Sequence, residues 1–269
     1  MKHALGIDVG SSFTKAVVLR EGILLSHAIL PSGGNYAETA RRVCKTAIEN
    51  AGISEAALSS RTATGYGAAA VDIADRTIAD ISCHAAGIFH LFPSVRTVLD
   101  IGCQFCRAIK LDGDGRPTNF VQNEKCASGS GKFLQVIARI LHMKVEDIGP
   151  LSLQSANPVE FTTGCAVFAE SEAVSRIAEG ASPADILAGV HKAMSAKIAN
   201  LTVRLGFAKD CAVTGGGAKD IGLVRTLEAE LAEPVLVPEE PWISAAMGAA
   251  LLGGCFQKTG SGIENSRKN

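Results

Sequence analysis

The sequence predicts an α/β protein of two similar lobes, because one segment occurs twice and helical patterns follow each copy. Residues 8–19 align without gaps with residues 100–111, with identical Asp, Gly, Phe, Ala and Leu. An apolar strand precedes each Asp, a turn follows each Leu, and a third strand follows at residues 23–29 and 119–122. Two β-meanders that each lead into helices indicate a duplicated α/β unit with pseudo-twofold symmetry.

Helical patterns fill the intervals after these strands. Apolar residues recur at helical spacing from Phe133 onward, which marks one face of a helix. Ser182 and Pro183 are a typical helix start, and Gly206 is a typical helix end. The expected helices cover residues 36–51, 75–92, 133–141 and 183–205, and short strands are expected at residues 212–214 and 236–237.

These elements divide the chain into two lobes and a tail. We expect residues 1–92 to form the first lobe, which the C-terminal helix at residues 243–256 completes. Residues 93–242 form the second lobe, and the polar residues 257–269 are expected to be disordered.

Composition excludes several classes of protein. The 269 residues carry 26 Lys and Arg against 27 Asp and Glu, so no basic field for nucleic acid exists. The longest apolar stretch, residues 243–256, is shorter than the ~20 residues that span a bilayer. The chain runs from Met1 almost directly into a strand, so we expect no signal peptide and a cytoplasmic protein. Its 8 cysteines should then be reduced, and any grouping of them points to metal or redox chemistry.

Each copy of the repeat has the pattern of a phosphate-binding loop. Asp8 and Asp100 each end a buried strand, and Gly10 and Gly102 follow in the turns. Glycine lets the backbone approach a phosphate, and the turn amides can donate to its oxygens. One such loop is equally typical of an ordinary turn, but two facing loops would hold a polyphosphate, with Mg²⁺ on the two carboxylates. The other residues expected to bind nucleotide are Ser11, Ser12, Lys15, Gly215, Gly216 and Gly217.

Two cysteines lie where helices are expected to begin. Cys126 precedes the helix that contains Phe133, and Cys165 opens the helix that runs to about Glu179. A helix N-terminus stabilises a thiolate and an anionic cluster. Two thiolates cannot complete a four-cysteine site, but a twofold dimer that contributes both from each subunit can hold a [4Fe–4S] cluster. The alternative is that both are capping or packing thiols.

The remaining cysteines have weaker claims to a metal. Cys103 and Cys106 have CxxC spacing, but strand alternation turns their side chains to opposite faces. Four others lie in apolar contexts and are expected to be core residues: Cys44, Cys83, Cys211 and Cys255.

Several motifs together resemble those of the BadF/BadG/BcrA/BcrD ATPase family. They are, in chain order, Gly-Ile-Asp-Val-Gly-Ser, Ala-Thr-Gly-Tyr-Gly, Ile-Ser-Cys-His-Ala, Leu-Asp-Ile-Gly, Lys-Cys-Ala-Ser-Gly-Ser-Gly-Lys-Phe-Leu, Cys-Ala-Val-Phe-Ala-Glu-Ser-Glu and Val-Thr-Gly-Gly-Gly. This resemblance implies an actin-like ATPase fold of the acetate and sugar kinase, heat-shock chaperone and actin superfamily, with ATP between two ribonuclease-H-like lobes.

The resemblance also implies partners and a cofactor. It implies a homodimer, or a heterodimer with a related ATPase subunit, that bridges one [4Fe–4S] cluster through Cys126 and Cys165. ATP hydrolysis would then drive an electron from a ferredoxin-like donor into the iron–sulfur subunits of a CoA-thioester reductase or dehydratase. Among the catalytic positions, Gln104 would orient the attacking water beside Asp8 and Asp100.

One departure from the family pattern bears on whether the chain resembles the reductase ATPase subunits or the dehydratase activators. Activators of 2-hydroxyacyl-CoA dehydratases usually have Asp-Ile-Gly-Gly-Gln-Asp in the second loop, whereas this chain has Cys103 in place of a Gly and Phe105 in place of the second Asp. On this basis we predict a benzoyl-CoA reductase-type ATPase subunit, with a dehydratase activator as the alternative. Two alternatives of other classes are a small-molecule kinase of the same fold and a catalytically silent assembly subunit.

Overall fold

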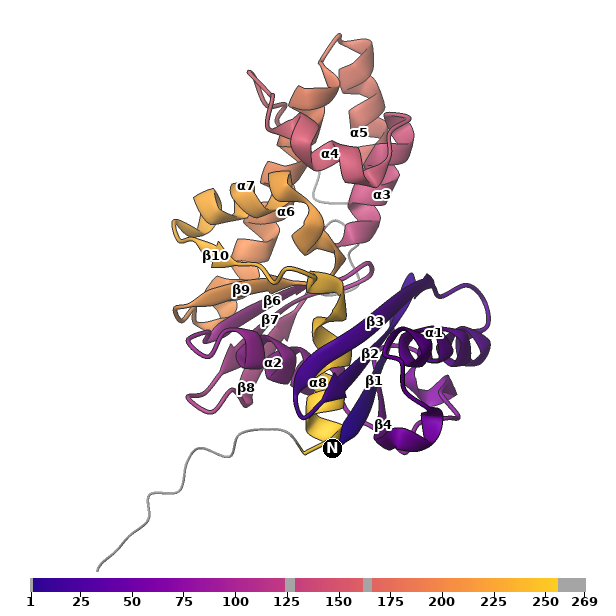
Figure 1. The fold of residues 1–269 in the computed structure, drawn as a ribbon. Helices are drawn as coiled ribbons and strands as arrows, with labels where there is room; N and C mark the ends of the chain where they lie inside the picture. Colours follow the sequence, from indigo (N-terminus) through magenta and orange to yellow (C-terminus); the bar gives the residue numbers. More distant parts are fainter. Residues whose placement is uncertain (1, 124–128, 162–165, 256–269) are drawn as a thin grey trace, which may run out of the picture.

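Two five-stranded sheets with the same strand order form the framework of the chain (Figure 1). The computed structural model describes residues 2–123, 129–161 and 166–255. The first sheet has the order β3-β2-β1-β4-β5, and the second has the order β8-β7-β6-β9-β10. The first comprises β1 (His3–Val9), β2 (Phe13–Arg20), β3 (Ile23–Pro31), β4 (Leu58–Thr64) and β5 (Arg76–Thr77). The second comprises β6 (Thr97–Ile101), β7 (Cys106–Leu111), β8 (Pro117–Gln122), β9 (Cys211–Thr214) and β10 (Val235–Leu236). The predicted two-lobed α/β fold is confirmed.

Strand register shows that the repeat extends further than the sequence alignment. Asp8 pairs with Lys15 across β2 and with Thr64 across the parallel strand β4. Asp100 occupies the same place in the second sheet, between Arg107 of β7 and Thr214 of β9. The turns after β4 and β9 are therefore equivalent as well as those after β1 and β6.

The helices of the first lobe follow the sequence pattern, with one difference. Helix α1 (Tyr36–Asn50) begins after Asn35, whose side chain accepts a hydrogen bond from the Glu38 amide. The two short 3₁₀ turns are η1 (Glu55–Ala57) and η2 (Ala68–Ala70). Helix α2 (Asp80–Leu91) begins five residues later than the predicted residue 75, because Arg76 and Thr77 pair with β4 instead.

Helices α2 and α8 (Ser244–Gly253) lie between the two sheets and cross each other (Figure 1). Helix α8 packs on the first sheet through Ala246 and Ala250, whereas Ala85 and Ile88 of α2 belong to the core of the second. At the crossing, a Cβ on Gly87 would collide with the Ser244 carbonyl, and one on Gly248 would collide with the Cys83 carbonyl. The residue limits of the two lobes remain a prediction. Helix α2 precedes residue 93 in the chain, yet it packs on the second sheet.

A group of helices stands on the second lobe, with α4 and α5 toward the top of Figure 1 and α3 running down from them toward the cleft. These are α3 (Gly131–Ile140), α4 (Val145–Ser152), α5 (Ala166–Ala178), α6 (Pro183–Leu205) and α7 (Ile221–Leu231), with the 3₁₀ turns η4 (Gly216–Lys219) and η5 (Pro241–Ile243). Helix α6 begins after Ser182 and ends at Gly206, which has a left-handed conformation, as its sequence predicts. Neither α4 nor α7 was expected.

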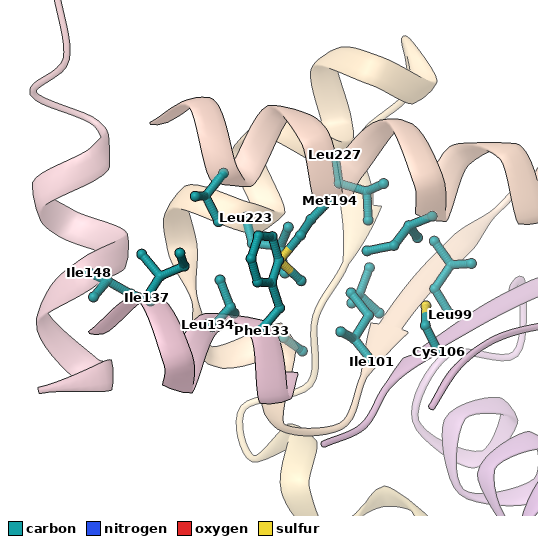
Figure 2. Packing of buried hydrophobic residues seen from close by; sticks show 14 of the residues in the cluster. Leu99, Ile101, Cys106, Phe133, Leu134, Ile137, Ile148, Met194, Leu223 and Leu227 are labelled. Carbon is teal, nitrogen blue, oxygen red and sulfur yellow. The ribbon is translucent and has the colours of Figure 1, made fainter. Parts of the chain in front are cut away.

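One apolar core joins these helices to the second sheet. Figure 2 shows buried side chains of α3, α6 and α7 packed together with Leu99 and Ile101 of β6. Phe133, Ile137 and Met194 are 3% exposed or less, so α3 and α6 form one body with the sheet. Within the described ranges, no helix has both the length and the apolar character to cross a membrane.

Candidate functional site

A cleft of about 600 Å³ lies between the lobes, at the ends of the central strands. Residues of four turns line it, one after each of β1, β4, β6 and β9. The structure brings every predicted catalytic and nucleotide-binding residue to this cleft, although their roles remain predictions: Asp8, Gly10, Ser11, Ser12, Lys15, Asp100, Gly102, Gln104, Gly215, Gly216 and Gly217.

The two aspartates are buried, and a cationic or ring nitrogen lies beside each. Lys15 Nζ donates to Asp8 Oδ2 at 2.8 Å. Asp100 Oδ2 lies 3.4 Å from His84 Nε2 and 3.9 Å from Arg107 NH1. Burying a carboxylate is costly unless partners compensate for lost water, and these groups supply that compensation. The other carboxylate oxygen of each residue lies against a glycine of a cleft turn. Asp8 Oδ1 lies against Gly65, and Asp100 Oδ1 lies against Gly215.

The glycines permit a close approach that no other residue would allow. Gly65 and Gly215 have φ values of +90° and +82°. A Cβ at Gly215 would lie 2.7 Å from both Asp100 Oδ1 and the Ile101 carbonyl oxygen. In the turns after β1 and β6, the Gly10 amide donates to the Phe13 carbonyl at 3.0 Å and the Gly102 amide to the Phe105 carbonyl at 2.9 Å. The two loops therefore have the same hydrogen-bonded turn.

The second loop is also bonded to helix α3. The Gly131 amide donates to the Gly102 carbonyl, and the Lys132 amide donates to the Cys103 carbonyl, both at 2.9 Å. The first turn of a helix has free amides, and here two of them are engaged by the loop. A displacement of the second loop would therefore move the start of α3.

Sequence reasoning missed several residues of the cleft. Asp80 and Arg107 line it. Tyr66 and His84 line it too, and both belong to motifs that carry the family resemblance. Trp242 stacks on Phe13 with ring centroids 4.7 Å apart, and Lys219 Nζ lies 5.0 Å from the Trp242 ring centre. The alignment of Lys15 with Arg107 in the repeat was a signal for Arg107. Nothing in the sequence pointed to Asp80 or Trp242.

The cysteines separate by position. Cys126 and Cys165 lie outside the described residues, and Cys165 directly precedes the first residue of α5. Cys103 lines the cleft whereas Cys106 is in the core, where burial raises its pKa. Cys255 is exposed after the end of α8, so the expectation that it is a core residue was wrong. The other three expected core thiols, Cys44, Cys83 and Cys211, are buried.

The cleft suits a nucleotide that brings its own Mg²⁺. Its volume is within the range of about 300–1,000 Å³ that is usual for small-molecule sites. Among the residues described, no group of three or more His, Cys, Asp or Glu is placed to hold a metal ion. Mg²⁺ on a polyphosphate needs only one or two protein carboxylates and keeps several waters. Asp8 and Asp100, each with Oδ2 engaged and Oδ1 beside a cleft turn, fit that requirement.

The fold and the cleft define the class, an actin-like ATPase with its candidate nucleotide site between two duplicated lobes. A glucokinase of the ROK family from Streptomyces griseus shares the fold alone, with a TM-score of 0.58 and 13% identity over 93% of this chain and 99% of that one. The activator of the 2-hydroxyisocaproyl-CoA dehydratase from Clostridium difficile, solved with bound ADPNP, has a TM-score of 0.90 and 35% identity. The match covers 95% of this chain and 96% of that one.

Residues 5–253 match the BadF/BadG/BcrA/BcrD ATPase family, and the chain belongs to that family. It is 39% identical to the activator of lactoyl-CoA dehydratase from Anaerotignum propionicum, over 93% of this chain and 96% of that protein. It is also 39% identical to a subunit of benzoyl-CoA reductase from Thauera aromatica, but over only 64% of each chain. The dehydratase activators therefore resemble this chain over more of its length than the reductase subunit that we predicted.

Proposed function

We propose that this protein is an ATP-hydrolysing activator that delivers an electron to a 2-hydroxyacyl-CoA dehydratase. One observation carries the proposal: two equivalent Asp–Gly loops face one cleft, and the second is hydrogen-bonded to α3, which follows Cys126. The similarity to dehydratase activators over 93% of the chain favours this branch over the predicted reductase subunit.

In this proposal the chain's own residues bind ATP and direct water to it. The amides of the turns after β1 and β6 donate to phosphate oxygens, and Lys15 adds a positive charge beside them. Asp8 and Asp100 would hold Mg²⁺, which neutralises phosphate charge when bound. Gln104, in the second loop, orients the water that attacks the γ-phosphorus. Trp242, Phe13 and Lys219 offer an aromatic and cationic wall at the same cleft.

The link to the cysteines is the step that makes the ATPase an activator. Loss of the γ-phosphate changes the contacts of the second loop, and the amides of Gly131 and Lys132 carry that change to the start of α3. Cys126 precedes α3 and Cys165 precedes α5, and α5 packs against α3. In a twofold dimer the two subunits would each contribute both cysteines, and the four thiolates would hold a [4Fe–4S] cluster. A ferredoxin-like protein would reduce this cluster.

Anaerobic purification with iron analysis tests the cluster. The wild type should contain about four irons per dimer and absorb in the iron–sulfur region. A Cys126→Ala variant should lose the iron, the absorbance and the dimer, whereas Cys44→Ala, which changes a buried thiol in the core of the first lobe, should keep all three. A colourless wild type after reconstitution with iron and sulfide would overturn the proposal.

A coupled assay tests whether the protein activates a dehydratase or serves a benzoyl-CoA reductase. The reduced protein with ATP should start dehydration of a 2-hydroxyacyl-CoA by a purified dehydratase component, and ADP should form in parallel. Support of benzoyl-CoA reduction alone would restore the reductase prediction. ATP binding without hydrolysis in either mixture would instead identify a silent assembly subunit.

A further inference from the structure

Helix α2 brings a histidine to the second carboxylate of the cleft. His84 is 8% exposed, lines the cleft, and places Nε2 3.4 Å from Asp100 Oδ2. Its other ring nitrogen, Nδ1, is buried and has no hydrogen-bond partner among the residues that the structure describes. A buried polar nitrogen without a partner lowers stability. Packing alone therefore does not explain a histidine at this position.

The pseudo-twofold repeat shows which group His84 replaces. In the first lobe, Lys15 is opposite Asp8 in the β1–β2 register and bonds Oδ2 at 2.8 Å. Arg107 is opposite Asp100 at the equivalent position of the second lobe. A direct copy of the first lobe would thus have Arg107 hold Asp100.

Arg107 is engaged elsewhere, however. Its NH1 pairs with Asp80, and its Nε donates to Gln122 Oε1 at 2.7 Å. The guanidinium also lies over the Phe105 ring, 5.5 Å from its centre. Its NH1 consequently stays 3.9 Å from Asp100 Oδ2, farther than His84 Nε2. His84 is the group from α2 that takes the place of Lys15.

We propose that His84 is a positioning residue for Asp100, an inference that rests on the proposed ATPase function. His84 Nε2 holds Oδ2, so that Oδ1 stays against Gly215 in the turn after β9. Without the imidazole, the attraction of Arg107 NH1 would turn Oδ2 toward itself and draw Oδ1 away from Gly215. Asp100 would then be misplaced for nucleotide-bound Mg²⁺ and for the attacking water, while the glycine turns would still bind the nucleotide.

Two amide substitutions separate this role from simple packing. In His84→Gln the side-chain amide reaches the place of Nε2, whereas in His84→Asn it is one bond shorter and reaches only the place of Nδ1. We expect His84→Asn to lower kcat for ATP hydrolysis by roughly 10- to 100-fold, with KM changed less than about twofold. His84→Gln should recover most of the lost kcat. Equal activity of both variants and the wild type would overturn the inference.

A binding measurement gives a readout that does not need hydrolysis. The affinity for a non-hydrolysable ATP analogue is measured with and without Mg²⁺ in the wild type and both variants. The Mg²⁺-dependent gain in affinity should fall in His84→Asn and persist in His84→Gln, while affinity without Mg²⁺ should stay the same. Cys83→Ala is the control for packing, because this neighbouring buried residue of α2 does not line the cleft.

The outcomes separate the inference from the function on which it rests. A wild type that binds the analogue and hydrolyses ATP, with a His84→Asn variant unchanged in both assays, would overturn only the role of His84. A similar loss in Cys83→Ala and His84→Asn, without recovery in His84→Gln, would reduce His84 to a packing residue. A wild type that binds no nucleotide would overturn the ATPase and the role of His84 together.

Discussion

At the scale of single residues, the six cysteines that the structure describes form two chemical classes. Burial raises the pKa of Cys44, Cys83 and Cys211 to about 12 and also raises that of Cys106. The thiolate is the reactive form, so these four should resist iodoacetamide in the native protein even at pH 9. Cys103, which lines the cleft, and Cys255, which is exposed, should react within minutes. Mass spectrometry of the labelled peptides measures both classes.

A nucleotide provides the internal control for this labelling. A saturating ATP analogue should protect Cys103, whose loop would lie against the phosphates, and leave Cys255 unprotected. Unfolding in urea should make all six cysteines react, because it removes the burial that raises the four pKa values. Labelling of Cys103 at an unchanged rate with bound nucleotide would contradict the assignment of this loop to phosphate.

At the scale of elements, Asp185 ties the loop after α4 to the start of α6. Its carboxylate accepts from Ser155 Oγ at 2.6 Å, from Ser182 Oγ at 2.7 Å and from the Asn157 amide at 2.9 Å. These donors, the Ser155 hydroxyl first, lower the pKa of Asp185 to about 2. A carboxyl with a lowered pKa in the folded state contributes stability above its ordinary pKa and loses it as the pH falls through the folded value.

We therefore expect Ser155→Ala to raise the pKa of Asp185 toward its ordinary value of 3.8. Ser155→Ala should then be less stable than the wild type at pH 8, and the difference should shrink as the pH falls toward about 2, where the wild-type carboxyl also becomes protonated. An NMR titration of the Asp185 carboxyl and urea unfolding at several pH values check both effects. Ser175→Ala, an exposed serine on α5, is the matched control. An unshifted Asp185 titration in Ser155→Ala would show that the hydroxyl does not lower the pKa.

The elements also show why the sequence revealed some parts of the site and concealed others. The loops after Asp8 and Asp100 were predictable because both copies keep Asp, Gly and Phe at the same spacing. The equivalence of residues 64–67 with residues 214–217 was concealed because Tyr66 stands where the other copy has Gly216, and became visible only in the strand register. His84 was unpredictable because its partner, Asp100, lies on a separate element of the chain, and no local pattern records such a contact.

At the scale of the whole molecule, the arrangement of the lobes depends on the crossing of α2 and α8. The two helix backbones touch where Gly87 meets Ser244 and where Gly248 meets Cys83. Each glycine lies four residues after the residue that the other helix contacts, so the crossing follows the same pseudo-twofold symmetry as the sheets. Because both helices lie between the lobes, a wedge at this crossing should change the cleft as well as the core.

Gly248→Ala introduces such a wedge, because its Cβ would collide with the Cys83 carbonyl and the backbone of α2 cannot yield as a flexible side chain would. We expect a loss of about 1–3 kcal/mol in the free energy of unfolding, typical of overpacking. Affinity for an ATP analogue should also fall, because His84 and Asp80 of α2 move with the helix. Gly113→Ala, where nothing lies within 4 Å of the new Cβ, is the matched control and should change neither quantity. Urea unfolding and analogue titration measure both. A destabilised Gly248→Ala variant with unchanged affinity would show that the helix crossing stabilises the core without setting the cleft.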